Sequence, residues 1–501
     1  MTGGNLYQRF ERVFEAHANR TAIRSADGAM SLTFGDLARG AARYADALAA
    51  LGVEPGDRVT VQVEKSISNV LLYLAVMKAG AVYQPLNTAY TAAEVAYFVE
   101  DAEPKLIVCD PSRQAEMRSL ADRCKVFAVV NLDAQGEGSL AAMAATMDER
   151  HETAARDADD LAGLLYTSGT TGRSKGAMIT HGNLASNAET LVELWRISAA
   201  DTLLHALPVF HVHGLYVALN TAFLAGSTMV WFNRFDVHAM LRAMPEATLM
   251  MGVPTFYTRL LSEESFTSEV AANMRLFISG SAPLLAETHS AFAARCGHAI
   301  LERYGMTETG MITSNPYEGA RVPGTVGFAL PGVSVRVRGE QPGVLEVKGP
   351  NVFKGYWRMP EKTREEFTED GYFITGDVCT MDAEGRVTIV GRAKDLIISG
   401  GFNVYPKEVE DVLDAMPGIG ESAVIGVPHP DFGEGVVAVV TAKGNLPPEA
   451  EMIAALARSL AKFKVPKRIF TVDELPRNTM GKVQKAELRK RHAGLFRENR
   501  T

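Results

Sequence analysis

The sequence is poor in cysteine, and its few cysteines form no recognisable pattern. Only four occur in 501 residues, and they are far apart in the chain: Cys109, Cys124, Cys296 and Cys379. Zinc sites and disulfide frameworks need cysteines at short, repeated spacings. We therefore expect reduced cysteines, packed mainly in the core of a cytoplasmic protein.

The segments that would place the protein at a membrane are also missing. No apolar run has the length of a bilayer span. The first ten residues lack the basic segment and apolar core of a signal peptide. With 51 basic against 59 acidic side chains, the chain also lacks the basic surplus typical of nucleic-acid-binding proteins. The sequence predicts a cytoplasmic protein without a membrane span or a nucleic-acid partner.

Length and patterning predict more than one domain of the α/β type. A chain of 501 residues exceeds the size of an ordinary single domain. Short apolar runs at 58–63, 106–109 and 126–130 alternate with helical patterns such as 70–79, which is typical of parallel sheets covered by helices. A helical face at 409–416, followed by a strand and a second helix, indicates a small α+β unit near the C-terminus.

The densest cluster of ligand-binding groups is the stretch Tyr166–Gly176. It combines glycines, hydroxyl side chains, one arginine and one lysine between two apolar runs. Glycines let the backbone approach a ligand closely and point its N–H groups at an anion. The spacing is not that of a Walker loop. The alternative, a surface turn rich in Ser, Thr and Gly, is less consistent with the flanking apolar runs, so we expect a different kind of polyphosphate loop.

Three further motifs follow in chain order. The turn Gly280–Pro283 ends an apolar strand, where open α/β sheets place ligands. The motif Tyr304–Thr309 holds one carboxylate, Glu308, between two threonines, and a magnesium triphosphate needs such a hard oxygen ligand. The motif Gly371–Asp377 ends on a carboxylate that can accept two hydroxyl groups.

Together with 391–401 and Pro476–Lys482, these motifs resemble those of the acyl-adenylate-forming enzymes, the AMP-dependent synthetase/ligase superfamily. That family includes acyl-CoA synthetases, peptide-synthetase adenylation domains and firefly-type luciferases. The resemblance begins at Leu32–Asp36 and covers nearly the whole chain. It implies a large N-terminal domain of helix-covered β-sheets, 1–392, that binds ATP and the acyl group. It also implies a small, mobile α+β C-terminal lid domain, 393–501, with the catalytic lysine.

The resemblance assigns roles to individual positions. The residues expected to hold the β- and γ-phosphates are Thr167, Ser168, Gly169, Thr170, Thr171 and Lys175. The other expected ATP contacts are Gly280, Ser281, Ala282, Tyr304, Gly305, Thr307, Asp377 and Arg392, the last two at the ribose. Glu308 is expected to ligate Mg²⁺, and Lys482 to bridge the substrate carboxylate and the α-phosphate. Thr167 and His211 complete the expected catalytic set.

Coenzyme A is the expected second substrate. In the family, a carboxylate attacks the α-phosphate of ATP to give an acyl-AMP and pyrophosphate, and the thiol of CoA then displaces AMP. The resemblance implies that the small domain rotates about Lys394 between these steps. The loop expected to line the pantetheine tunnel is Ser399, Gly400, Gly401 and Phe402, where adjacent glycines would let a narrow ligand pass against the backbone.

The acid is predicted from the residues expected at or near the acyl pocket, which are His211, Arg234, Ser281 and Met306. The second carboxylate of a dicarboxylic acid needs a buried partner, and an arginine can supply two parallel hydrogen bonds. We assign that role to Arg234. The stretches 207–214 and 232–236 resemble those of malonyl-CoA synthetases. Malonate is therefore the predicted substrate, and methylmalonate a poorer one, because one methyl group discriminates weakly.

Several alternatives stay open at this point. The enzyme could activate a short-chain, medium-chain or aryl monocarboxylic acid, or load a carrier protein as a stand-alone adenylation enzyme. A luciferase-like oxygenase has no specific support, and Glu308 and Lys482 disfavour a non-catalytic nucleotide-binding protein. Family lysines at the position of Lys482 can be acylated, so a lysine acetyltransferase and deacetylase are expected partners. Such a modification would remove the charge that acyl-AMP formation needs.

Overall fold

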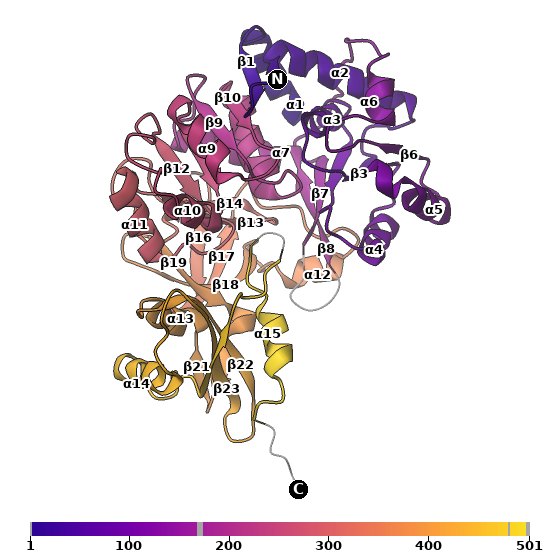
Figure 1. Cartoon of the computed structure of the whole chain (residues 1–501). Coiled ribbons are helices and arrows are strands. Elements are labelled where there is room, and N and C mark those ends of the chain that lie inside the picture. Colours follow the sequence, from indigo (N-terminus) through magenta and orange to yellow (C-terminus); the bar gives the residue numbers. More distant parts are fainter. Residues whose placement is uncertain (1–2, 168–173, 479–480, 497–501) are drawn as a thin grey trace. The chain divides into compact units, whose positions relative to one another are not determined.

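A computed structural model describes residues 3–167, 174–478 and 481–496 of the chain (Figure 1). Helices and sheets alternate along it, and the sheets include long runs of parallel strands. The predicted α/β fold of helix-covered sheets, followed by a smaller α+β part, is therefore confirmed.

The contacts divide the chain into two compact units. The first comprises 1–334 and 348–373, and the second comprises 335–347 and 374–501. The expected boundary after Arg392 lies inside the second unit. That boundary and the mobility of the C-terminal part stay predictions.

The larger sheet of the first unit has nine strands, in the order β15-β14-β13-β12-β11-β9-β10-β1-β2. In chain order these are β1 (Thr21–Ser25), β2 (Ser31–Thr33), β9 (Thr202–His205), β10 (Thr228–Trp231), β11 (Leu249–Gly252), β12 (Leu276–Ser279), β13 (Leu301–Met306), β14 (Gly310–Ser314) and β15 (Phe328–Ala329). The strands from β13 to β1 pair in parallel, so β9, β12 and β13 all end at one edge of the sheet. The hairpin β13–β14 is antiparallel.

The second sheet of this unit has six strands, in the order β6-β5-β3-β4-β7-β8. Its strands are β3 (Arg58–Gln62), β4 (Val82–Pro85), β5 (Leu106–Cys109), β6 (Ala128–Asn131), β7 (Leu161–Thr167) and β8 (Lys175–Thr180). All neighbours pair in parallel except β7 and β8, which form an antiparallel hairpin. Each sheet thus carries a hairpin at the end of a parallel run, and both hairpins coincide with nucleotide motifs of the sequence.

Helices cover the faces of these sheets, as parallel strands require. They are α1 (Leu6–Ala16), α2 (Phe34–Ala50), α3 (Ile67–Lys78), α4 (Ala92–Ala102), α5 (Gln114–Cys124), α6 (Ser139–Ala144), α7 (His181–Leu194), α8 (Asn220–Ala225), α9 (Val237–Ala243), α10 (Pro254–Leu261), α11 (Ala286–Cys296) and α12 (Pro360–Glu365). Single 3₁₀ turns occur at Pro111–Arg113 and Met244–Glu246, and a π-helical segment at His213–Leu219.

The motif Leu32–Asp36 is explained by the start of α2. The Thr33 side chain accepts the backbone N–H of Asp36, and the Asp36 carboxylate accepts the backbone N–H of Thr33. This reciprocal capping box satisfies two N–H groups that a helix start leaves unpaired. Thr180 and Asn183 form the same arrangement at α7, directly after the phosphate-loop hairpin.

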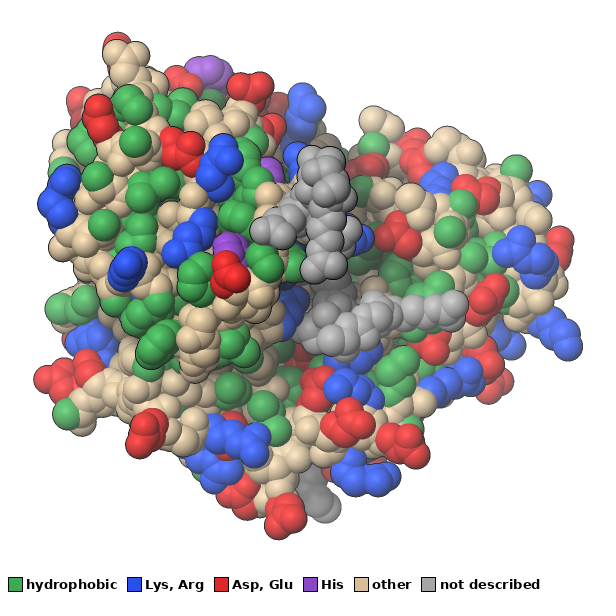
Figure 2. Space-filling model, turned by 90° about the horizontal axis from the view of Figure 1, so that it is seen from below, with side chains coloured by type: hydrophobic (Ala, Val, Ile, Leu, Met, Phe, Trp, Pro, Cys, Tyr) green, Lys and Arg blue, Asp and Glu red, His purple; other side chains and the backbone are tan. Residues whose placement is uncertain are grey.

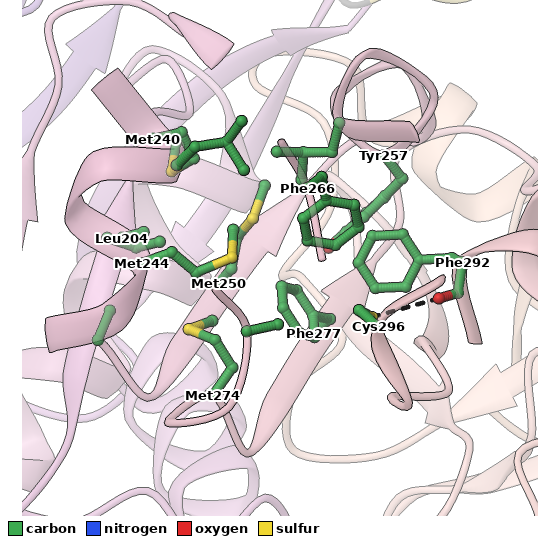
Figure 3. Packing of buried hydrophobic residues seen from close by; sticks show 14 of the residues in the cluster. Leu204, Met240, Met244, Met250, Tyr257, Phe266, Met274, Phe277, Phe292 and Cys296 are labelled. Atoms are coloured by element: carbon green, nitrogen blue, oxygen red, sulfur yellow. Dashed lines mark hydrogen bonds between the residues drawn. The ribbon is translucent and has the colours of Figure 1, made fainter. Parts of the chain in front are cut away.

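A core of methionine and aromatic side chains supports the nine-stranded sheet near the predicted turn at Gly280 (Figure 3). Phe292 packs edge to face against Phe277 and Tyr257, with ring centroids 4.9 and 5.3 Å apart. The Tyr257 hydroxyl donates to the backbone oxygen of Ile278 at 2.5 Å. This bond ties α10 to β12, whose carboxyl end carries that turn. Cys296 lies in the same core and donates to the Phe292 carbonyl.

The four cysteines are free thiols. Cys109, Cys296 and Cys379 are buried, as expected, and Cys124 is partly buried. Burial raises the pKa of the Cys296 thiol to about 11, which keeps it protonated near neutral pH.

The second unit contains two sheets. A four-stranded sheet has the order β16-β17-β18-β19, with β16 (Ser334–Arg338), β17 (Gly343–Lys348), β18 (Phe373–Met381) and β19 (Val387–Arg392). The other has the order β21-β20-β23-β22, with β24 paired to β23. Its strands are β20 (Ile397–Ser399), β21 (Phe402–Val404), β22 (Ile419–His429), β23 (Gly433–Ala442) and β24 (Arg468–Val472).

Helices lie on both faces of this second sheet. The helices α13 (Pro406–Asp414) and α14 (Glu449–Ser459) lie on one side and α15 (Lys485–His492) on the other (Figure 1). Two separate apolar clusters correspond to these faces, one including Leu413 and Leu456 and the other including Leu475 and Leu488. A 3₁₀ turn at Ala393–Asp395 precedes the sheet.

On the face seen in Figure 2, acidic and basic side chains are interspersed. Among the residues that the structure describes, no helix has the length and apolar character of a membrane-crossing segment.

Candidate active site

The predicted phosphate loop is the connection of the hairpin β7–β8. Thr167 ends β7, Lys175 begins β8, and the two residues are paired across the hairpin. Four of the predicted phosphate contacts, Ser168, Gly169, Thr170 and Thr171, lie outside the described residues. The two ends of the loop, which carry one hydroxyl and one ammonium group, are therefore held on paired strands.

Lys175 is held by two side chains from the segment before β18. Its ammonium group lies 2.7 Å from Glu366 Oε1 and 4.0 Å from the centre of the Tyr356 ring. The Tyr356 hydroxyl donates to the other oxygen of Glu366 at 2.7 Å. Both members of the ion pair are largely buried, at 13% and 21% side-chain exposure, so solvent screens their attraction only partly. Sequence reasoning missed Glu366 and Tyr356, because neither belongs to a nucleotide motif.

Glu308 lies at the tip of the hairpin β13–β14 and is 5% exposed. Its Oε1 atom accepts the Thr167 hydroxyl at 3.3 Å, and the Tyr356 hydroxyl lies 3.2 Å from the same atom. The tyrosine has one proton to donate and is closer to Glu366. Burial, followed by the neighbouring carboxylates of Glu308 and Glu366, raises the Tyr356 pKa. The structure thus brings together Thr167, Glu308 and, through Tyr356 and Glu366, Lys175.

These groups fit a magnesium triphosphate. A buried carboxylate beside a hydroxyl offers hard oxygen ligands, and phosphate oxygens usually complete the shell of Mg²⁺. The described residues hold no cluster of three or more His, Cys, Asp or Glu side chains that would bind a metal by themselves. A site with one carboxylate is consistent with a metal that arrives with its nucleotide.

The turn after β12 brings a serine against a histidine. Ser281 has a left-handed backbone, with φ of 71°, and its hydroxyl lies 3.1 Å from His213 Nδ1. His213 starts the π-helical segment, a local widening that is frequent at functional sites. Burial, followed by the nearby charge of Arg303, holds the His213 pKa well below its usual value. This imidazole is therefore neutral.

Arg303, in β13 directly before the predicted nucleotide motif, was missed by sequence reasoning. It is 4% exposed, and no described residue accepts a hydrogen bond from its Nε or Nη2. Burial lowers its pKa to about 9. Its guanidinium packs on Gly280, where a Cβ atom would stand 2.4 Å from Cζ. A buried arginine without a carboxylate partner is costly in the free protein and favours an anionic ligand.

Unsatisfied nitrogen atoms of His213 and Arg303 could bind the same anion. His213 Nε2 is buried and, like Arg303 Nε, has no hydrogen-bond partner among the described residues. With the Ser281 hydroxyl bonded to the other imidazole nitrogen, the turn offers a guanidinium, an imidazole and a hydroxyl. Such a set is suited to a carboxylate or another planar anion.

The sequence assigned the second carboxylate of the acid to Arg234. This residue is exposed and lines a cavity of about 200 Å³. The residues around this cavity are Val63, Glu64, Lys65, Thr88, Ala206, Pro208, Val209, Phe210, Asn233, Arg234, Phe235 and Phe256. None of the other predicted acid-pocket residues, His211, Ser281 or Met306, lines it.

The remaining predicted residues of the first unit lie near Glu308 and Ser281 in the chain. Tyr304, Gly305 and Met306 form the end of β13, and Thr307 begins the hairpin tip. Gly305 is required there, because a Cβ atom would stand 2.1 Å from the Gly310 carbonyl oxygen. Gly280 and Ala282 flank Ser281 in the turn.

His211 lies two residues before His213 and accepts its backbone N–H. His205, by contrast, is a buried structural histidine bonded to Lys65 and Gly214.

In the second unit, the two residues predicted at the ribose are brought together. Asp377 in β18 and Arg392 in β19 pair across their hairpin, and Arg392 Nε lies 2.6 Å from Asp377 Oδ1. The Asp377 side chain is 4% exposed. Lys394, the predicted hinge residue, follows in the exposed turn Ala393–Asp395.

The predicted CoA loop is a tight hairpin. Ser399 and Phe402 pair, and Gly400 and Gly401 form the two-residue turn with φ of 60° and 83°. Positive φ at both positions is the requirement of a type I′ turn, which explains the two glycines. Ser399 is buried, whereas Phe402 is exposed and stacks on Phe463 at 4.7 Å.

Comparison with known proteins places this arrangement in a family. Residues 10–357 match the AMP-binding enzyme family, and residues 408–482 match the AMP-binding enzyme C-terminal domain. The chain belongs to the AMP-binding enzyme family, and the resemblance inferred from its motifs is confirmed.

Three relatives within this family illustrate the similarity. The ATP-bound structure of MatB from Rhodopseudomonas palustris is 54% identical, with a TM-score of 0.95, covering 99% of this chain and 100% of that one. A malonate–CoA ligase from Arabidopsis thaliana is 33% identical over 97% of this chain and 89% of its own length. A feruloyl-CoA synthase from Amycolatopsis sp is 36% identical over 94% and 96%.

Proposed function

We propose that the protein is an ATP-dependent acid–thiol ligase that makes malonyl-CoA from malonate, ATP and coenzyme A, with release of AMP and pyrophosphate. The observation that supports malonate as the substrate is Arg303, a buried guanidinium whose Nε and Nη2 have no partner among the described residues. Malonate has one carboxylate to activate and a second one to pair with this cation. Relatives that are malonate–CoA ligases support the same class of acid.

The anchor for the second carboxylate is therefore proposed to be Arg303, with His213 and Ser281 as hydrogen-bond partners. Arginine can bind a carboxylate through two parallel N–H groups. The sequence instead gave this role to Arg234, which is exposed and lines a cavity that Arg303, His213 and Ser281 do not line. His211 and Met306 stay as proposed neighbours of the acyl group.

The first half-reaction joins two anions and so needs positive charge and oriented donors. Lys175 and Thr167 would hold the β- and γ-phosphates, and Glu308 would ligate Mg²⁺, which neutralises phosphate charge when bound. An oxygen of the malonate carboxylate attacks the α-phosphorus, and pyrophosphate leaves with the electron pair of the broken P–O bond. Lys482 supplies a positive charge to the oxygens that approach one another.

In the second half-reaction, the thiol of CoA loses its proton and attacks the acyl carbon of malonyl-AMP, and AMP leaves. The turn Gly400–Gly401 has no side chains, so its backbone can line a narrow path for pantetheine. Asp377 and Arg392 are proposed to hold the ribose, and Lys394 to act as the hinge. The cytoplasmic location and the acylation of Lys482 by a lysine acetyltransferase also stay proposals.

Pyrophosphate release tests the function directly. The assay contains CoA and Mg²⁺ and compares malonate, methylmalonate, succinate, octanoate and ferulate, for the wild-type protein, Arg303→Gln and Arg234→Gln. We expect a strong preference for malonate that is lost in Arg303→Gln and kept in Arg234→Gln. Loss in Arg234→Gln alone would restore the anchor predicted from the sequence.

An aryl monocarboxylic acid is the second candidate, because the feruloyl-CoA synthase is as similar in sequence as the malonate ligases. Activity on ferulate that is insensitive to Arg303→Gln would support it and contradict malonate. Release of phosphate and ADP in place of pyrophosphate and AMP would contradict both.

A further inference from the structure

Lys482 is carried by a short hairpin of the second unit whose two ends are described. The backbone N–H of Asn478 donates to the Lys482 carbonyl at 2.9 Å, and the Asn478 side-chain oxygen accepts the Lys482 N–H at 2.9 Å. Arg477 and Val483 form an antiparallel bridge on either side. These contacts fix the backbone of Lys482 within the hairpin, but they do not attach the hairpin to the rest of the unit.

Arg477 provides one polar attachment of the hairpin to the sheet. One nitrogen of its guanidinium, Nη1, donates to the carbonyl of Gly481, the residue directly before Lys482, and another, Nη2, donates to Glu421 of β22. The side chains of Arg477 and Glu421 are 24% and 35% exposed. A single planar group therefore joins the peptide next to the lysine to a strand of the central sheet. This uses the fixed fork geometry of arginine, which lysine lacks.

A bulge in β22 aims Glu421 at the hairpin. Opposite β23, Ile419 pairs with Ala442 and Glu421 with Thr441, so Gly420 is an extra residue. In a regular strand, residues two positions apart, such as Ile419 and Glu421, lie on the same face. The bulge places them on opposite faces. Ile419 packs in the cluster with α13 and α14. The face that carries Glu421 is the one with the other cluster, which includes Leu475 and Val483 from the two sides of the hairpin. Bulges commonly re-aim a side chain in this way.

A second ion pair follows the hairpin. Lys485 Nζ lies 2.6 Å from Glu410 Oε1, and the same oxygen accepts the backbone N–H of Val424 in β22 at 2.7 Å. The two side chains are 20% and 11% exposed. The chain is therefore tied to β22 or its covering helix both before and after Lys482.

We infer that Arg477, through Glu421, is a positioning residue for acyl-AMP formation: it holds the Lys482 hairpin to the sheet of the second unit. This inference rests on the proposed role of Lys482 in the first half-reaction. Small displacements of a reacting group cost large factors in rate, since an error of about 1 Å can cost about 100-fold. The thiol step, in which Lys482 has no proposed role, does not need the hairpin to be in place.

The test separates the two half-reactions in the full-length protein. Malonate-dependent exchange of pyrophosphate into ATP reports the first, and CoA-dependent AMP release from preformed malonyl-AMP reports the second. We expect Arg477→Gln to lower the exchange rate by about 100-fold and to leave the thiol step unchanged. Glu421→Gln should show a smaller loss of the same kind. Exchanging the charges, in Arg477→Glu with Glu421→Arg, should recover part of the lost exchange activity.

A matched control is Arg468→Gln, which breaks another ion pair of the same unit. In that pair, Arg468 Nε lies 3.0 Å from Glu449 Oε1. Neither step should change in that variant. Equal loss of both steps in Arg477→Gln and Glu421→Gln would show a general structural role and overturn the inference, as would unchanged exchange in both.

Lys482→Ala distinguishes a failure of this inference from a failure of the proposed function. If Lys482→Ala abolishes exchange while Arg477→Gln does not affect it, only the positioning role is wrong. If Lys482→Ala keeps full exchange activity, the role proposed for the lysine is wrong, and the positioning role is wrong with it.

Discussion

Two arginines of the first unit are packed in opposite ways. Arg275 lies against Asp201, with Nε–Oδ1 of 2.7 Å and Nη2–Oδ2 of 2.8 Å, and also donates to the carbonyls of Trp195 and Arg196. Arg303 is more deeply buried, and its Nε and Nη2 have no acceptor among the described residues. Burial lowers the pKa of Arg303 to about 9. Burial also lowers the pKa of Arg275, but the hydrogen bonds that Arg275 donates to Asp201, together with the charges of Asp201 and Tyr317, raise it overall.

This difference distinguishes an arginine that stabilises the fold from one that is proposed to bind the substrate. Arg275 has its carboxylate in the same chain, so its charge is satisfied in the free protein and the pair stabilises the fold. Under the proposed function, Arg303 gains a carboxylate partner only when malonate binds. A protein retains such a costly group where binding gains from it, since removing the partner of a buried charge costs several kcal/mol.

The largest effect is expected from Arg303→Gln. We predict that kcat/KM for malonate falls about 1,000-fold, equivalent to about 4 kcal/mol of lost ion pairing. The KM for ATP and the thermal midpoint should not fall, because the variant removes an unpaired buried charge. Steady-state kinetics and thermal melts measure these quantities. Arg303→Lys should remain impaired, since lysine cannot donate in the same planar fork. An unchanged KM for malonate would contradict the assignment.

Arg275→Gln should show the opposite pattern. It leaves Asp201, whose side chain is 4% exposed, without its cation, and we expect about 3–5 kcal/mol of lost stability. Urea denaturation measures this loss, while the KM for malonate should stay the same in the folded variant. The double variant Arg275→Gln with Asp201→Asn should recover part of the stability. A large change in KM would mean that Arg275 also affects the acid pocket.

Asp414 in the second unit is another buried ionisable group without a full set of partners, and its pKa is raised. Burial is the largest cause that raises its pKa to about 7, Glu410 and Glu421 also raise it, and Ser422 and Lys407 lower it. Between pH about 4 and 7 the unfolded chain has lost this proton and the folded protein retains it. Stability therefore falls as pH rises through this window, with a slope of at most about 1.4 kcal/mol per pH unit.

The Asp414→Asn variant tests this prediction. Its stability should lack that part of the pH dependence and should exceed the wild-type value at pH 8, measured by denaturation at several pH values. Identical slopes in the two proteins would show that Asp414 is ionised in the folded state at neutral pH.

The smallest effect is expected from Arg358→Gln. Arg358 forms a two-bond pair with Glu103, as Arg275 does with Asp201, but the side chains are 47% and 56% exposed. Exposed pairs contribute little, so we expect a change in unfolding free energy below about 1 kcal/mol. This variant separates the contribution of burial from that of geometry. A loss as large as in Arg275→Gln would show that geometry dominates.

The sequence by itself determined the features that depend on neighbouring residues. The strand at 58–63 and the helix at 70–79 were predicted, because hydrophobic periodicity acts over a few positions. The turn at Gly400–Gly401 follows from the need for positive φ. The order of the motifs was sufficient to predict the family, which the comparisons confirm.

Only the tertiary structure decided which charged groups are paired. Arg275 and its partner Asp201 are 74 residues apart in the chain. No local pattern shows that Arg275 has a carboxylate partner and that Arg303 has none in the described part of the chain. The same holds for Glu366 beside Lys175, and for Arg234, which lines a cavity that none of the other predicted acid-pocket residues lines. Periodicity gives the face on which a side chain lies, but burial and pairing depend on distant segments that meet only in the folded chain.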